Sequence, residues 1–176
     1  MVRNRFSLED TESLRSKIFR VVNDEDAPIA EVLRALAQCQ AHIENRTIME
    51  HILKECGLRS SGFKTNEQLE LYYDIAQGKR DVGYISKGWD DPGFRIGDIV
   101  EVPKWKIAAL REHAYVLLKY CATRGVVMTV KENDDDSVEL QMDSVIYSDG
   151  FNEKVFVQVL HYLTECVQKA HDTFEV

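Results

Sequence analysis

Residues 126–142 read VVMTVKENDDDSVELQM. The run at 126–131 is rich in β-branched residues, and apolar and polar residues alternate from 138 to 142, which is typical of two strands. The polar residues between the two runs favour a turn. The stretch therefore predicts a β-hairpin with one half-buried strand.

Residues 152–174, which follow the hairpin, read NEKVFVQVLHYLTECVQKAHDTF. Apolar residues recur there at steps of three and four, and this spacing predicts a long amphipathic helix. Asn152 stands just before the pattern, where its side-chain oxygen can accept a hydrogen bond from a first-turn N–H group. The predicted buried stripe consists of Phe156, Val159, Leu163, Val167, Ala170 and Phe174.

Further elements are predicted toward the N-terminus. Short apolar runs indicate strands at 82–85 and 94–102, and an apolar stripe indicates a helix at 107–121. Capping residues and apolar stripes predict four earlier helices, at 8–21, 28–43, 45–56 and 65–77. The predicted fold class is α+β. It has a helical N-terminal part of four helices, followed by a β-β-α-β-β-α unit whose helices pack on an antiparallel sheet.

The domain division follows from this change of character. We expect a helical N-terminal region over residues 1–60 and an α+β domain over residues 61–176, with a single fused domain as the alternative. The chain has 176 residues, of which 44% are hydrophobic, so it can bury a core and does not have the composition of a disordered chain.

The composition also predicts a soluble cytoplasmic protein. No segment approaches the roughly 18 consecutive apolar residues of a membrane span, and residues 1–10 lack the apolar run of a secretory signal. The four cysteines, Cys39, Cys56, Cys121 and Cys166, lie far apart. In a cytoplasmic protein they are expected to be free and mostly buried thiols.

The net charge of −8 is unevenly distributed. Residues 126–176 carry 3 basic and 11 acidic side chains, whereas the rest of the chain is balanced. A negative field repels phosphate backbones, which argues against nucleic-acid binding. The acidic region is interpreted either as a solvated face that aids solubility or as a surface for a basic partner, including one that mimics nucleic acid.

Catalytic and cofactor signatures are absent from the sequence. It has no phosphate-binding glycine loop, no dinucleotide fingerprint, no zinc-protease helix and no calcium loop. His113 has no second histidine one turn away, and His161 with Glu165 would make only half of a metal site. We therefore expect no metal and no cofactor.

Two acidic loops are the candidate partner-binding sites. The loop from Lys87 to Arg95 combines turn residues with aromatic side chains, which often anchor a bound partner, although the same residues also make ordinary turns. The second loop is the tip of the predicted hairpin, which lacks the glycine of a calcium loop. The candidate residues are Trp89, Asp90, Asp91 and Phe94 in the first loop, and Asp134, Asp135, Asp136 and Glu139 in the second.

The C-terminal part of the chain, over about residues 125–176, resembles the type III secretion chaperone-like family. The resemblance rests on the hairpin, the Asp149-Gly150 break and the helix with Phe156, Val159 and Leu163. It implies a small acidic cytoplasmic protein, usually homodimeric, that holds an extended segment of a client protein without catalysis. Members of that family usually have one helix before their first strands, which differs from the four predicted here.

The leading functional hypothesis is a non-catalytic protein-binding module, such as a small acidic cytoplasmic chaperone or adaptor. It would bind a protein partner and would bind neither nucleic acid nor a membrane. A homodimer is one of its expected forms. The alternative is an acidic inhibitor or immunity-type protein that blocks a nucleic-acid-binding enzyme. A third hypothesis is an enzyme whose site is assembled from distant residues, with His113, His161, Asp90 and Asp91 as its candidates.

Overall fold

The computed structural model describes residues 16, 19, 20, 23, 28–65, 71–88, 90–132 and 137–176. Within them the element order is α-β-β-β-β-α-β-β-α. The helices are α2 (Ile29–Glu55), α3 (Ile107–Ala122) and α4 (Glu153–Phe174). The strands are β1 (Arg59–Thr65), β2 (Leu71–Gln77), β3 (Arg80–Lys87), β4 (Gly93–Pro103), β5 (Val127–Glu132) and β6 (Ser137–Tyr147). Single turns of 3-10 helix follow β4 (Lys104–Lys106) and β6 (Ser148–Gly150).

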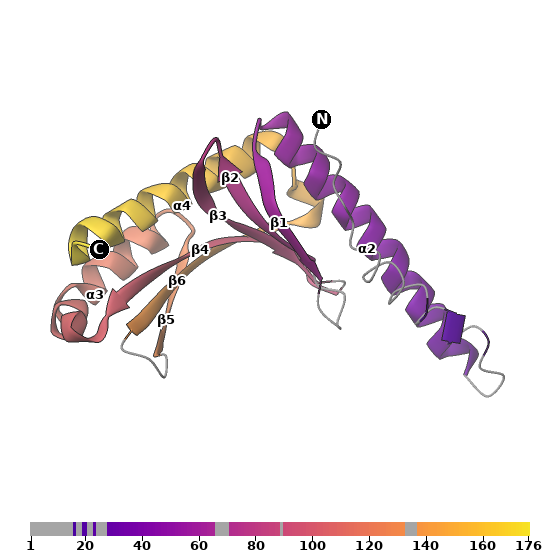
Figure 1. Cartoon of the computed structure of the whole chain (residues 1–176), viewed down its shortest axis with the longest axis horizontal. Coiled ribbons are helices and arrows are strands. Elements are labelled where there is room, and N and C mark those ends of the chain that lie inside the picture. The colour runs from indigo at the N-terminus through magenta and orange to yellow at the C-terminus, as the bar shows by residue number, and fades with distance from the viewer. Residues whose placement is uncertain are drawn as a thin grey trace.

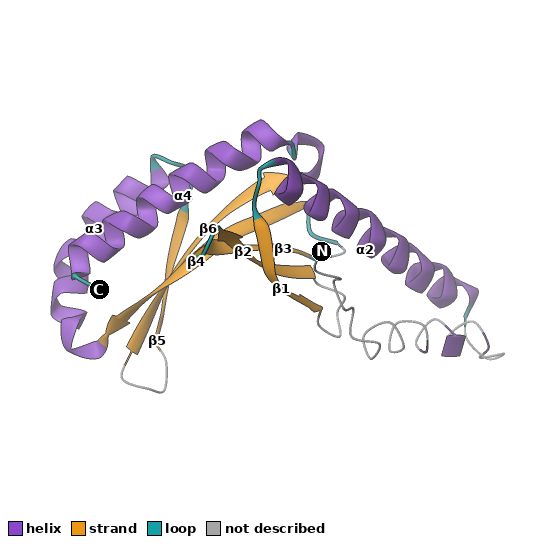
Figure 2. Cartoon of the chain, turned by 45° about the horizontal axis from the view of Figure 1, so that its top comes forward, coloured by secondary structure: helices purple, strands orange, loops and turns teal. Residues whose placement is uncertain are grey.

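The strands form one six-stranded antiparallel sheet in the order β1-β2-β3-β4-β6-β5. Helix α3 carries the chain from β4 to the edge strand β5. Strand β6 then returns between β4 and β5 and pairs with both. Figure 1 shows α3 and α4 on one face of the curved sheet, and Figure 2 shows the same arrangement after rotation. No described helix covers the opposite face, which we call the open face.

The core lies between the sheet and α4. Asn152 caps this helix, since its side-chain oxygen accepts a hydrogen bond from the Val155 N–H at 3.2 Å, as the sequence predicts. Phe156, Leu163 and Phe174 of the predicted stripe are buried against the sheet. The apolar residues of β4 and β6 that alternate toward the same side complete this core: Phe94, Ile96, Val100, Val102, Val138, Leu140, Met142 and Ile146.

Helix α2 joins this core only through its C-terminal part. Met49, Ile52 and Leu53 are buried in the same hydrophobic cluster as the sheet. The Tyr73 hydroxyl of β2 donates a hydrogen bond to Glu50 at 3.2 Å, which ties the helix to the sheet. The N-terminal part of α2 extends beyond the edge of the sheet (Figures 1 and 2).

The predicted fourth helix, over 65–77, is wrong. Residues 71–77 form β2, with Leu71, Tyr73 and Ile75 buried on one side of the strand. Their spacing of two is the period of a strand, and pairing with β1 and β3 satisfies the backbone on both sides. The predicted break near residue 44 is also wrong, because α2 continues through Asn45 to Glu55.

The helical N-terminal part of four helices followed by a β-β-α-β-β-α unit is therefore corrected. Among the described residues, one long helix and four strands precede α3, and two strands and α4 follow it. The predicted helix at 8–21 lies largely outside the described residues. The α+β class is confirmed, and all four cysteines are free, with Cys39, Cys121 and Cys166 buried.

None of the helices in the described ranges combines the length and the apolar character needed to cross a membrane.

Candidate partner-binding site between β3 and β4

The candidate site is an acidic pocket of about 350 Å³. Three carboxylates and two phenols line it, together with one glycine and one aliphatic side chain. The lining residues are Tyr72, Asp74, Asp81, Gly83, Tyr84, Asp98 and Ile99. They come from three neighbouring strands, β2, β3 and β4.

The pocket lies where β3 and β4 separate. These strands pair only where Arg95 to Gly97 of β4 meet Ser86 to Tyr84 of β3, whereas β4 pairs with β6 along its whole length. Beyond Gly97, the side of β4 that faces β3 has no strand partner in the described part of the chain. The Ile99 N–H donates instead to its neighbour's carboxylate, Asp98 Oδ1, at 2.8 Å. A free strand edge therefore borders the pocket.

Glycine at position 97 lets a phenol cross the open face. Tyr84 pairs with Gly97, and Gly97 pairs with Asp143, so the three residues form one row across β3, β4 and β6. The Tyr84 hydroxyl donates to Asp143 Oδ1 and accepts from Gln141 Nε2 at 3.0 Å. A Cβ at position 97 would lie 2.6 Å from Cζ of the phenol, so any side chain there would displace the ring.

A β-bulge brings the third carboxylate to the pocket. Ile75 of β2 pairs with Gly83, but the next residue of β2 pairs with Asp81, so Val82 is an extra residue in β3. Because side chains alternate between the two faces of a strand, one extra residue reverses the side to which the preceding residues point. The bulge therefore turns Asp81 to the open face, on the same side as Asp74.

The electrostatics of the pocket favour a cation. The rings of Tyr72 and Tyr84 stack with centroids 5.0 Å apart and an interplanar angle of 22°. Burial, followed by the charge of Asp74, raises the pKa of Tyr72 to about 12, and burial also raises the pKa of Asp98. Carboxylates with aromatic rings make a suitable environment for an arginine or lysine side chain, which forms charge-assisted hydrogen bonds and cation–π contacts.

The raised pKa of Tyr72 predicts a loss of stability in alkali. The phenol of an unfolded chain ionises near pH 10, so the folded protein retains a proton that the unfolded chain has lost. The Tyr72 contribution is therefore fully present below about pH 10 and is lost as the pH rises toward 12. Phenolate absorbance should show that Tyr72→Phe removes a titration near pH 12 from the folded protein. In urea, where the chain is unfolded, the titration that Tyr72→Phe removes should lie near pH 10.

Two of the candidate residues in the loop before β4, Phe94 and Asp91, make contacts within the fold. Phe94 is buried and stacks on Phe151 with centroids 3.9 Å apart, so its side chain is not exposed to a partner. The Asp91 carboxylate accepts from the Gly88 N–H at 2.8 Å, and the buried Lys87 ammonium donates to the carbonyl oxygens of both residues. These bonds close the turn. Asp90 is exposed, and Trp89 lies outside the described residues.

The acidic hairpin tip is described only in part. Asp134, Asp135 and Asp136 lie outside the described residues. Glu139 is on the open face of β6, where its carboxylate is 3.9 Å from the ammonium of Lys131. The role of this tip in binding stays a prediction.

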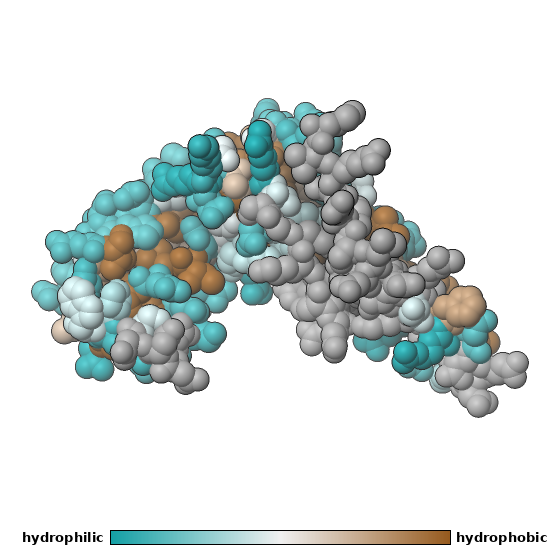
Figure 3. Space-filling view, in the orientation of Figure 1, coloured by the Kyte–Doolittle hydropathy of each residue, from teal (hydrophilic) through white to brown (hydrophobic). Residues whose placement is uncertain are grey.

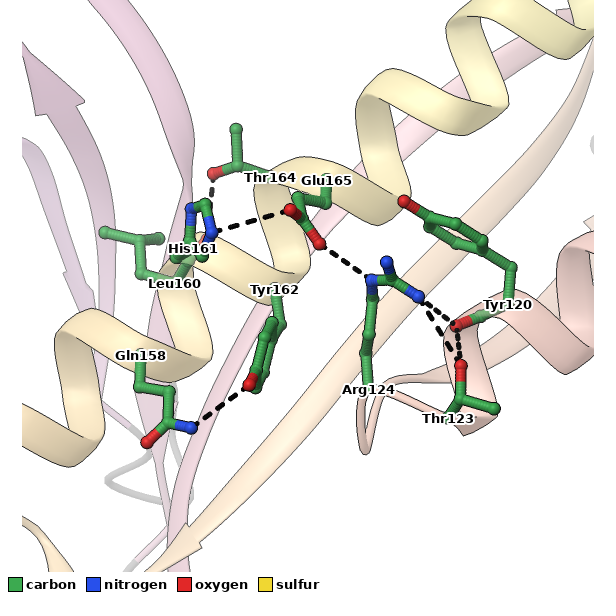
Figure 4. Close-up of polar contacts among 9 residues, drawn as sticks. All are labelled: Tyr120, Thr123, Arg124, Gln158, Leu160, His161, Tyr162, Thr164 and Glu165. Atoms are coloured by element: carbon green, nitrogen blue, oxygen red, sulfur yellow. Dashed lines mark hydrogen bonds and ion pairs between the residues drawn. The ribbon is translucent and has the colours of Figure 1, made fainter.

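The structure places the residues considered for catalysis or metal binding on separate elements, with His113 on α3, His161 on α4 and Asp90 and Asp91 before β4. Figure 4 shows Glu165 of α4 between Arg124 and His161, with an Arg124 Nε–Oε2 distance of 2.7 Å and a His161 Nε2–Oε1 distance of 3.5 Å. Arg124 holds the pKa of the Glu165 carboxyl below its usual value. His113 lies exposed on α3. Among the described residues, no three His, Cys, Asp or Glu side chains are placed to hold a metal ion.

None of the residues that line the pocket is among the candidates that the sequence predicts. The sequence predicts a helix for Tyr72 and Asp74, and it predicts strands for Tyr84 and Asp98 without marking them as site residues. The alternation in LYYDI at 71–75 was a usable signal for a strand with one polar side. The bulge and the row across Gly97 had no local signal, because they depend on pairing between strands.

Comparisons with known proteins identify the fold. The chain matches no family model and none of the curated proteins. It is similar to the crystal structure of an uncharacterized protein from Methanothermobacter thermautotrophicus, with a TM-score of 0.55 and 13% identity over 73% of this chain and 98% of that chain. It is also similar to YbjN, a proposed transcription regulator from E. coli, with a TM-score of 0.50 and 13% identity over 70% of this chain and 89% of that chain. Neither is described as a secretion chaperone, so that resemblance stays a prediction, and the likeness to these two structures is one of fold alone.

Proposed function

We propose that this chain is a non-catalytic protein-binding module of the cytoplasm. It holds an extended segment of a partner protein along the free edge of β4, with a basic side chain of that segment in the acidic pocket. The opening between β3 and β4, which places the edge beside the pocket, carries the proposal. A chaperone or adaptor role would use this site.

The free edge supports binding of an extended segment. In an antiparallel pair, successive residues direct their backbone groups alternately to one neighbour and to the other. The Ile99 N–H bonds to the Asp98 carboxylate and faces away from β6, so by alternation the backbone groups of Glu101 also face away from β6. An extended peptide that adds at an exposed sheet edge uses such groups, and neighbouring pockets select its side chains.

The pocket supports selection of a basic side chain. Asp74, Asp81 and Asp98 contribute carboxylates, and the stacked phenols contribute aromatic surface. Arginine suits this combination because its planar guanidinium forms paired hydrogen bonds and also stacks on rings. A neutral side chain of the same shape would leave the carboxylates without a charged partner.

The experiment uses a short capped peptide with one arginine between β-branched residues, and a second peptide with citrulline, its neutral analogue. Titration calorimetry should show that the arginine peptide binds at least about tenfold more tightly, which corresponds to about 1.4 kcal/mol. The double variant Asp74→Asn, Asp81→Asn should lose this preference. Equal binding of both peptides by the wild-type chain would contradict the proposal.

Two controls separate the pocket and the edge from general attraction to an acidic chain. The double variant Glu132→Gln, Asp149→Asn removes the same charge from exposed positions outside the pocket and should keep the preference. Glu101→Pro removes an N–H from the free edge and should weaken the binding of both peptides. Glu101→Gln keeps that N–H and should bind both peptides as the wild type does.

The inhibitor hypothesis makes a different prediction. It depends on the acidic excess of residues 126–176, so binding of a basic nucleic-acid enzyme should be lost on neutralising Asp134, Asp135, Asp136 and Glu139. The same variant should leave the arginine peptide preference unchanged, because that preference is assigned to the carboxylates of Asp74, Asp81 and Asp98.

A further inference from the structure

A row of exposed side chains on α2 has the spacing of a coiled-coil seam. Ile29, Leu33, Leu36 and Ile43 are 79%, 61%, 45% and 60% exposed. The exposed polar residues Gln40 and Thr47 continue the row. The six positions follow one another at alternating steps of four and three, which is the heptad pattern of helices that pack side by side. We call this row the α2 stripe, and it consists of Ile29, Leu33, Leu36, Gln40, Ile43 and Thr47.

We propose that the α2 stripe pairs antiparallel with the α2 stripe of a second copy of this chain. The proposal is independent of the peptide site between β3 and β4. The direction follows from the fold, since the sheet and the other helices lie at the C-terminal end of α2 (Figures 1 and 2). A parallel pair would bring two such bodies to the same end of the helices, whereas an antiparallel pair places them at opposite ends.

The stripe is complementary to itself in this direction. With the twofold axis near residue 38, every position of one seam meets a seam position of the other. Ala37 lies beside the seam and meets the partner's Ala37, and these small side chains allow the helices to approach closely. Glu44 meets the partner's Ala30, so the seam brings no like charges together. The paired layers are Leu33 with the partner's Ile43, Leu36 with the partner's Gln40, and Ile29 with the partner's Thr47.

The charge distribution favours a second copy at this place. The chain as a whole carries a net charge of −8, which opposes self-association. That excess lies in residues 126–176, whereas residues 29–55 contain three basic and four acidic side chains. Two copies that meet through α2 therefore meet where the charge is nearly balanced.

The apolar character of the exposed row agrees with this assignment. In the orientation of Figure 3, hydrophobic colour is visible at a few places toward the projecting end of α2. The C-terminal part of α2 is already held in the core, so the helix does not have to form at the moment of pairing. Preorganisation of this kind lowers the entropic cost of association.

Light scattering on a sizing column, over a series of protein concentrations, tests the proposal on the full chain. The wild type is expected to be a dimer. Leu33→Glu should be a monomer at the same concentrations, because twofold symmetry places the new charge in two layers at once. Val116→Glu, the matched control, makes the same kind of change at a residue of α3 that is 59% exposed and should remain a dimer.

Crosslinking tests the pairing itself. In a Cys39→Ala background, Ala37→Cys should form a disulfide-linked dimer on mild oxidation by air. Glu31→Cys, on the side of the helix away from the stripe, should not. A wild-type chain that is monomeric at every concentration would overturn the proposal, and residues 1–27 of the same chain would then be the next candidate to cover the stripe. A dimer that survives Leu33→Glu, or equal crosslinking of the two cysteine variants, would overturn it as well.

Discussion

Phe94→Ala is expected to lower the free energy of unfolding by about 3–5 kcal/mol, the usual cost of removing a buried aromatic ring. Phe94 is 1% exposed and stacks on Phe151, which lies just before α4. The ring also lies 5.8 Å from the ammonium of Lys87, whose hydrogen bonds close the turn before β4. Removing the ring therefore leaves a cavity where β4, the turn and the start of α4 meet. Urea unfolding, followed by circular dichroism, measures the change.

Asp90→Ala is the matched control in the same loop. Asp90 is exposed, so its substitution should change the unfolding free energy by no more than about 0.5 kcal/mol. The pair of variants separates the two interpretations of this loop. If Phe94 were a surface anchor for a partner, Phe94→Ala would leave the unfolding curve unchanged and would act only on binding.

The elements that the sequence predicts well are those with a long and regular period. The helix over 152–174 has an apolar face that extends for its whole length, and its capping residue occupies the expected place. The strand predicted at 94–102 from its apolar run, which contains Ile96, Ile99, Val100 and Val102, becomes β4. In both cases one local pattern agrees with the packing of the finished fold.

The N-terminal half was harder to predict because its local signals are ambiguous. Tyr72 and Tyr73 are adjacent, and adjacent apolar residues occur in helices as well as in strands that have side chains on both faces. The Ser60-Ser61-Gly62 run has the composition of a linker, but the chain there forms β1 through pairing with β2. Asn45 is a common capping residue, but Arg46 pairs with Glu50 at 2.8 Å across the next turn, and the helix continues.

The candidate site could not be predicted from the sequence, since none of its determinants is local. Asp81 reaches the open face only because Val82 is an extra residue relative to β2. Tyr84 reaches Asp143 only because the residue between them in the sheet is Gly97. The acidic excess of the sequence predicts a surface for a basic partner on the acidic loops, whereas the carboxylates of the pocket come from strands that the sequence does not bring together.

Gly83→Ala is the second variant with a large expected effect, a loss of about 2–5 kcal/mol from backbone strain and steric overlap together. Gly83 has a φ of +121°, a conformation that residues with a side chain rarely adopt. An added Cβ would lie 2.4 Å from the carbonyl oxygen of Gly97, which is part of the β4 backbone and cannot rotate away. The substitution should therefore push β3 and β4 apart at the wall of the pocket and remove the arginine peptide preference.

Gly78→Ala is the control that separates strain from overlap. Gly78 also has a positive φ, +66°, but an added Cβ there would meet no atom within 4 Å. It should cost about 1–2 kcal/mol, the strain of a left-handed residue alone, and should leave peptide binding intact. Equal losses from the two variants, measured by urea unfolding, would mean that the close approach of Gly83 to β4 contributes nothing. The close approach of β3 to β4 at Gly83 would then not determine the shape of the pocket.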